Sequence, residues 1–138
     1  MRTEEWIDWI EHVTTRPSMW IQPGTYDNVV AFLAGYDLAL QGAFLAGFDE
    51  WLAMRYRRAH NMAWSGMIRR EVIPNVDEAE LSDGQQSELL LALRQLLVEF
   101  MQHRKEVGLR SIYHEYEKWL KRRRNAAPLP DRYQRPGA

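Results

Sequence analysis

The chain of 138 residues contains no cysteine. This absence excludes a disulfide framework, a thiolate nucleophile and any zinc or iron–sulfur site held by cysteine. The sequence also lacks an apolar run near the roughly 20 residues that a membrane-spanning helix needs. Its first five residues, MRTEE, carry acids where a signal peptide carries basic and apolar residues. We therefore expect a cytoplasmic protein with no membrane partner.

Recognisable catalytic motifs are missing as well. No glycine-rich phosphate loop, nucleophile elbow or zinc-binding helix motif occurs in the sequence. His114 and Glu117 share a predicted helix face, but two ligands without a third do not make a metal site. Asp49 and Glu50 are adjacent on a predicted helix and point in different directions, so they do not form a general acid/base pair. We predict no catalytic residue, no metal and no cofactor.

The net charge of the chain is only -1, but the two signs are unevenly distributed. Basic residues are in the minority in the first part of the chain, and acidic residues are in the minority in the last part. Residues 1–101 hold 8 Lys and Arg against 15 Asp and Glu, a net charge of -7, whereas residues 102–138 hold 10 against 4, a net charge of +6. The body is therefore acidic and the end is basic. Such a separation can steer the encounter with a charged partner, but it does not bear on the fold.

What the sequence has in abundance is helical periodicity. Thr25 is placed to cap a helix that Gly42 ends, and a capping box at Ser82 precedes a long apolar stripe that stops at Gly108. The segment 61–75 is compatible with a short helix or an irregular stretch. The stripe of the long helix consists of Leu89, Leu90, Leu93, Leu96, Leu97, Phe100 and Met101.

These patterns predict an all-α protein, a compact bundle of about five or six helices. We expect a single helical domain over residues 1–125 and a flexible, proline-rich C-terminal tail over residues 126–138. The last helix, capped near Ser111, is expected to end in a basic run. Its inward face is predicted to consist of Ile112, Tyr113, Tyr116, Trp119 and Leu120.

Two tryptophans and one acidic segment are the candidate binding residues. Most of the six tryptophans fall on inward stripes, but Trp20 and Trp64 lie in or near loops. An aromatic residue in such a position either covers the core or anchors a partner. The acidic segment is either a solvated loop or a surface for a basic partner, and its residues are Asp77, Glu78, Glu80 and Asp83.

A series of motifs runs through the first half of the chain: Arg16-Pro17-Ser18-Met19-Trp20-Ile21, Gly35-Tyr36, Gly47-Phe48, Trp51-Leu52, Trp64 and Ile68. In these motifs the chain resembles a group of small, all-helical bacterial proteins that confer immunity to polymorphic toxins. Gln22 and Pro23 stand where that group carries a glycine. The resemblance implies a cytoplasmic inhibitor that binds a toxin domain without a cofactor.

We therefore expect a non-catalytic protein-binding module, most concretely an immunity-type inhibitor that neutralises a toxin or effector domain. The oligomeric state stays open. One alternative is a nucleic-acid-binding or regulatory protein that uses the basic residues 121–124, although the acidic body would repel nucleic acid. A second alternative is an enzyme whose site is assembled from distant residues such as His60, Arg69 and Glu71.

Overall fold

The computed structural model describes residues 2–58, 62–77 and 80–126. This part of the chain contains six α-helices and no strand, which confirms the predicted all-α fold. The predicted tail from residue 127 onward lies outside the described residues, and Ala126 is still helical. The elements are α1 (Thr3–Thr15), η1 (Pro17–Met19), α2 (Tyr26–Ala39), α3 (Phe48–Tyr56), α4 (Trp64–Val72), α5 (Asp83–Val107) and α6 (Leu109–Ala126).

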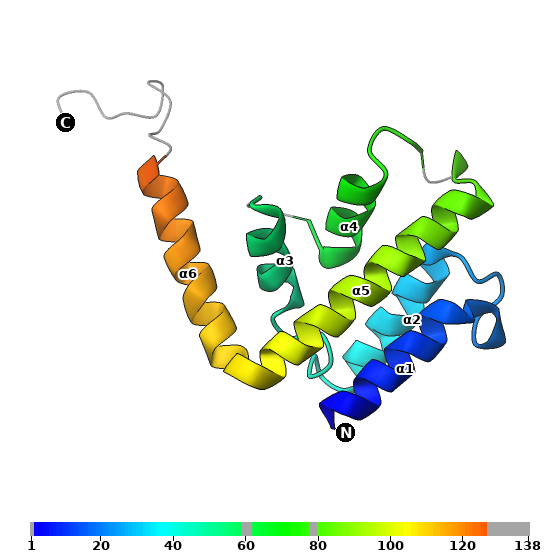
Figure 1. Ribbon diagram of the computed structural model, residues 1–138, viewed down its shortest axis with the longest axis horizontal. Helices are drawn as coiled ribbons and strands as arrows, with labels where there is room; N and C mark the ends of the chain where they lie inside the picture. The colour runs from blue at the N-terminus through cyan, green and yellow to red at the C-terminus, as the bar shows by residue number, and fades with distance from the viewer. Residues whose placement is uncertain (1, 59–61, 78–79, 127–138) are drawn as a thin grey trace.

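Helix α5 crosses the whole body of the molecule (Figure 1). All seven residues of its predicted apolar stripe are buried, as expected from their three- and four-residue spacing. The predicted capping box is present. The Ser82 hydroxyl accepts a hydrogen bond from the Gln85 backbone N–H at 3.1 Å, and the Gln85 side chain accepts one from the Ser82 N–H at 2.9 Å. Gly108 ends the helix with a positive φ of 87°.

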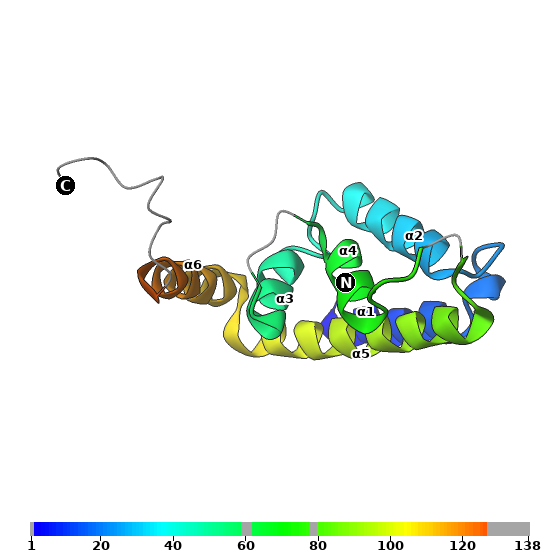
Figure 2. The same cartoon turned by 90° about the horizontal axis from the view of Figure 1, so that it is seen from above.

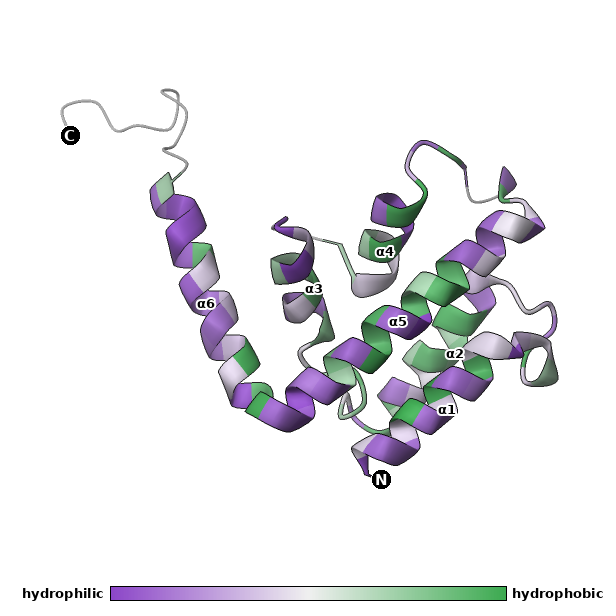
Figure 3. Cartoon of the chain, viewed as in Figure 1, coloured by the Kyte–Doolittle hydropathy of each residue, from purple (hydrophilic) through white to green (hydrophobic). Residues whose placement is uncertain are grey.

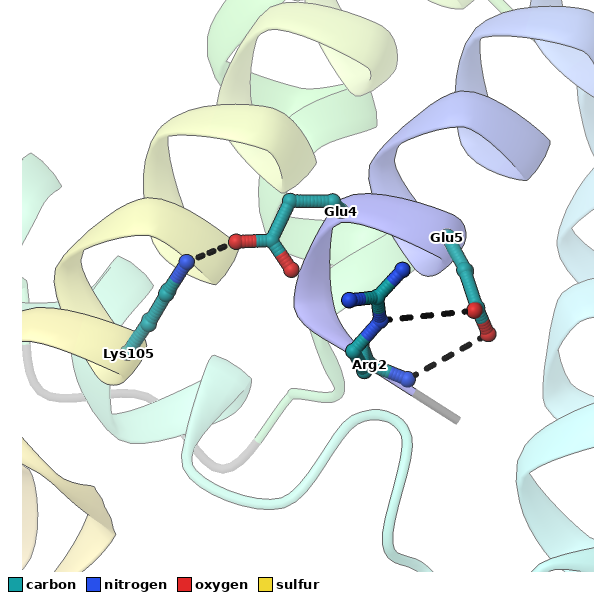
Figure 4. Close-up of polar contacts among 4 residues, drawn as sticks. All are labelled: Arg2, Glu4, Glu5 and Lys105. Atoms are coloured by element: carbon teal, nitrogen blue, oxygen red, sulfur yellow. Dashed lines mark hydrogen bonds and ion pairs between the residues drawn. The ribbon is translucent and has the colours of Figure 1, made fainter.

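Helix α1 lies along α5, and α2 forms a second layer over this pair (Figure 2). An aromatic cluster joins the layers, because the Trp9 ring lies 4.5 Å from the Tyr36 ring and 5.9 Å from the Phe44 ring. At the start of α1, Glu4 forms an ion pair with Lys105 of α5 (Figure 4). Both of these side chains are exposed, so the aromatic cluster contributes more to holding the layers together.

Helices α3 and α4 complete the core around Phe48. This side chain is fully buried, and its ring lies 5.0 Å from Phe100 of α5 and 5.6 Å from Trp64 of α4. The open question about residues 61–75 is resolved in favour of a helix over Trp64–Val72. Asp49 of α3 starts this helix, because its carboxylate accepts a hydrogen bond from the Trp64 backbone N–H at 2.7 Å.

Substitutions of Asp49 test whether its carboxylate caps α4. Burial raises the pKa of its carboxyl, against the lowering effect of the Trp64 N–H. Asp49→Asn keeps an acceptor oxygen, so we expect its stability at pH 7 to match the parent within about 0.5 kcal/mol, while Asp49→Ala should cost about 1 kcal/mol. The folded state binds the Asp49 proton more tightly than the unfolded state does. The parent should therefore lose stability relative to Asp49→Asn as the pH rises from the ordinary carboxyl pKa to above the raised pKa of the folded state. Urea unfolding of the three proteins at several pH values measures this, and an opposite pH trend would contradict it.

Helix α6 leaves the body as an arm (Figure 1) and is mostly hydrophilic (Figure 3). It begins at Leu109, directly after Gly108, rather than near Ser111. The predicted inward face is wrong in part: only Ile112 is buried, and Tyr113 is exposed. The reason is geometric, because the arm turns away from α5 at Gly108 and packs mainly on α3 and α5.

Candidate partner-binding surface

The outer face of α2 is apolar and exposed. The helix contains no Lys, Arg, His or Glu. Of its two aspartates, Asp27 is exposed in the first turn, four residues before Ala31, and Asp37 accepts a hydrogen bond from the Leu45 N–H at 2.8 Å. Its inner face, Val29 and Leu33, is fully buried. A surface helix usually carries charged residues along its outer face, but beyond Asp27 this face has none. The exposed residues of the opposite face, which we call the α2 stripe, are Ala31, Ala34, Gly35 and Leu38.

The α2 stripe has the geometry of a helix-packing surface. Its members recur at three- and four-residue steps, so they lie in one line along the helix. Leu38 is 78% exposed, which leaves a large side chain free to enter a partner. No atom lies within 4 Å of the position that a Cβ on Gly35 would occupy, so nothing in the described structure covers this point. A second helix could therefore approach α2 closely here.

The predicted acidic residues lie at the start of α5 and in the loop before it. Asp77, Glu80 and Asp83 are all exposed, and the Glu80 N–H donates to the Asp77 carbonyl at 2.9 Å. Glu78 lies outside the described residues. Asp83 shares a shallow hollow with Thr25, the residue that caps α2. The acidic segment therefore borders the N-terminal end of α2.

The two candidate tryptophans have different surroundings. Trp20 is 50% exposed and follows η1. The loop between α1 and α2, which carries Trp20, lies at the same end of the molecule as the start of α5 (Figures 1 and 2). With Met19 and the end of α1, Trp20 lines a hollow of about 380 Å³. Trp64 is only 8% exposed and packs on Phe48, because α4 turns it into the core. Trp64 is therefore enclosed in the core, whereas Trp20 is accessible.

Arg69 and Glu71, the two described residues of the enzyme alternative, have separate partners. Arg69 is buried, and its guanidinium donates hydrogen bonds to the Ile73 and Val76 carbonyls, which hold the loop after α4. Glu71 forms an ion pair with Arg58 at 2.7 Å. His60 lies outside the described residues. Within the described ranges, no group of three or more His, Asp or Glu residues could hold a metal ion.

The α2 stripe is the feature that sequence reasoning missed. The available signal was the lack of long charged side chains in residues 26–39, since a helix at the protein surface usually carries them. Among the described helices, none is long and apolar enough to cross a membrane. No protein-family model, curated protein or solved structure matches this chain.

Proposed function

We propose that this protein is a non-catalytic binding module that acts as an immunity-type inhibitor of a basic toxin or effector domain. The observation that carries the proposal is the exposed, apolar α2 stripe on a helix whose N-terminal end borders the acidic segment. Apolar faces of this kind are typical of protein interfaces. The apolar stripe would supply the dehydrated centre of the contact, and the acidic residues would form its charged rim.

The two parts of the surface have separate roles in this proposal. Leu38 is the largest exposed side chain of the α2 stripe, so burying it contributes affinity and slows dissociation. Asp77, Glu80 and Asp83 attract a basic partner over a distance and speed association. Trp20 and Met19 extend the apolar contact area at the end where the acidic residues lie.

Leu38→Glu tests the apolar part. We expect this change to leave the melting temperature within about 3 °C of the parent, since exposed substitutions rarely alter stability by more than about 0.5 kcal/mol. Partner binding should weaken at least about tenfold, because a charge would be buried at the centre of the contact. The matched control is Leu91→Glu, the same change on the exposed side of α5, where the parent side chain is 45% exposed.

The measurement begins with affinity capture from the native host, followed by reconstitution of the captured protein with the purified chain. The proposal expects a one-to-one complex with a basic protein, inhibition of that protein's activity and loss of both with Leu38→Glu alone. Association should slow with added salt and with Asp77→Lys combined with Glu80→Lys. A chain that only pairs with itself through α2, or a partner that retains full activity in the complex, would overturn the proposal.

A further inference from the structure

Basic residues from two separate segments meet at the outer end of α6. The arm runs back past the end of α3, and the Arg123 guanidinium donates a hydrogen bond to the Arg57 carbonyl at 2.8 Å. This contact brings the basic end of α6 to the basic residues that follow α3. We call this group the basic tip, and it consists of Arg57, Lys121, Arg122, Arg123 and Arg124.

The basic tip is not neutralised by the rest of the described chain. Neighbouring cations do have partners: Arg58 pairs with Glu71 at 2.7 Å, and Lys118 lies 3.8 Å from Glu115. Within the described residues, by contrast, no member of the basic tip forms an ion pair with a carboxylate. All of them are exposed. Five cations without a carboxylate partner, gathered at the outer end of α6, attract a polyanion strongly.

Most acidic residues of the described chain lie away from the basic tip, although Glu117 stands one helical turn before Lys121 on the arm. The outer end of α6 and the start of α5 are on opposite sides of the molecule in both views (Figures 1 and 2). Closer to the tip, Glu99, Glu106 and Glu115 line a groove at the base of the arm. These carboxylates repel an anionic ligand from the base of the arm, which leaves the last turns of α6 as the place where such a ligand can bind. The repulsion expected from the acidic body therefore does not apply at the tip.

The aromatic residues of the arm narrow the choice of polyanion. The Trp119 ring stacks on Tyr116 with centroids 6.0 Å apart, and the Arg123 guanidinium lies 4.9 Å from the Trp119 centroid. Trp119 is thus engaged within the protein and does not form an open platform for unpaired bases. The apolar side of the arm also faces α3 and is half-buried, so it does not present the free apolar face that a membrane-surface helix needs.

We propose that the basic tip binds the phosphate backbone of double-stranded nucleic acid without reading its sequence. The cations on the outer side of the arm contact phosphates, while Arg123 holds the arm against α3. Rows of phosphates at fixed spacing suit a rigid helix end that presents several cations. This site is separate from the α2 stripe, so either proposal can fail without the other.

The test uses a fluorescein-labelled 24-base-pair DNA duplex of mixed sequence and fluorescence anisotropy at several salt concentrations. The variant Lys121→Gln/Arg122→Gln/Arg124→Gln removes three cations and keeps Arg123, so the arm stays packed. Its matched control is Arg16→Gln/Arg70→Gln/Arg110→Gln, which removes three exposed cations outside the tip. Circular dichroism confirms that both variants are folded.

We expect the parent to bind the duplex with a slope of log Kobs against log salt of about -4, as for four or five phosphate contacts. The tip variant should bind at least about tenfold more weakly, with a slope shallower by about 3, whereas the control should stay within about twofold. A second duplex of different sequence should bind equally well. The proposal is overturned if the parent does not bind at 50 mM salt, if both variants lose affinity equally, or if single strands or phosphatidylserine vesicles bind better than the duplex.

Discussion

Phe48→Ala should lower the free energy of unfolding by about 3 to 5 kcal/mol, the range for truncating a buried phenylalanine. The Phe48 side chain is fully buried, and it is the point where α3, α4 and α5 meet. Its ring also stacks on Trp51 at 6.1 Å. Truncation therefore leaves a cavity that no single helix can fill by a small shift. Chemical denaturation monitored by circular dichroism measures the loss.

Phe32→Ala is the matched control for this loss. The Phe32 side chain is 36% exposed and contacts Trp9 at the edge of the layer between α1 and α2. We expect it to cost only about 1 kcal/mol, the scale of one aromatic pair. Equal losses for Phe32→Ala and Phe48→Ala would mean that the core is not centred on Phe48.

Gly47→Ala is the second change with a large expected effect, a loss of about 2 to 4 kcal/mol. Gly47 has a φ of 90°, a left-handed conformation that costs an alanine about 1 to 2 kcal/mol. A Cβ at this position would also lie 2.7 Å from the Leu109 Cδ1 atom at the start of α6. Relieving that overlap adds a cost of about 1 to 2 kcal/mol, because the end of the Leu109 side chain has to shift.

A double-mutant cycle separates these two costs. Leu109→Ala removes the overlapping atom, so Gly47→Ala should cost at least about 1 kcal/mol less in that background. As a control, Gly35→Ala lies in a helix with open space around the new Cβ, and we expect it to stabilise the protein by about 0.5 to 1 kcal/mol. If the two losses in the cycle are strictly additive, positions 47 and 109 do not interact. Gly47 would then have no part in positioning the arm against α3.

The proposed binding surface shows why periodicity alone misses an interface. In α2 the apolar residues occur on every side, so their spacing cannot say which side faces the core. Packing decides this: Val29 and Leu33 are buried in the core and Tyr36 packs on Trp9 of α1, which leaves Leu38 exposed. The acidic segment and Trp20, in contrast, could be selected from composition and position, and Trp20 and the described residues of the segment are exposed.

The basic tip could not be assembled from the sequence either. Residues 121–124 stand out as a cationic run, but Arg57 lies more than 60 positions earlier in the chain. They meet because the arm turns at Gly108 and returns along α3. Sequence spacing has no information about such a return, since it depends on the direction in which the chain leaves one helix and enters the next.

The sequence by itself determined most elements of this protein, because helices depend on local signals. The capping box at Ser82, the cap at Thr25, the stop at Gly108 and the stripe of α5 all lie within a few residues of the structure that they specify. Only the tertiary structure decided that Trp64 is enclosed, that Leu38 is free and that α6 projects as an arm. These outcomes depend on which other helix reaches each face, and that is set by contacts between residues far apart in the chain.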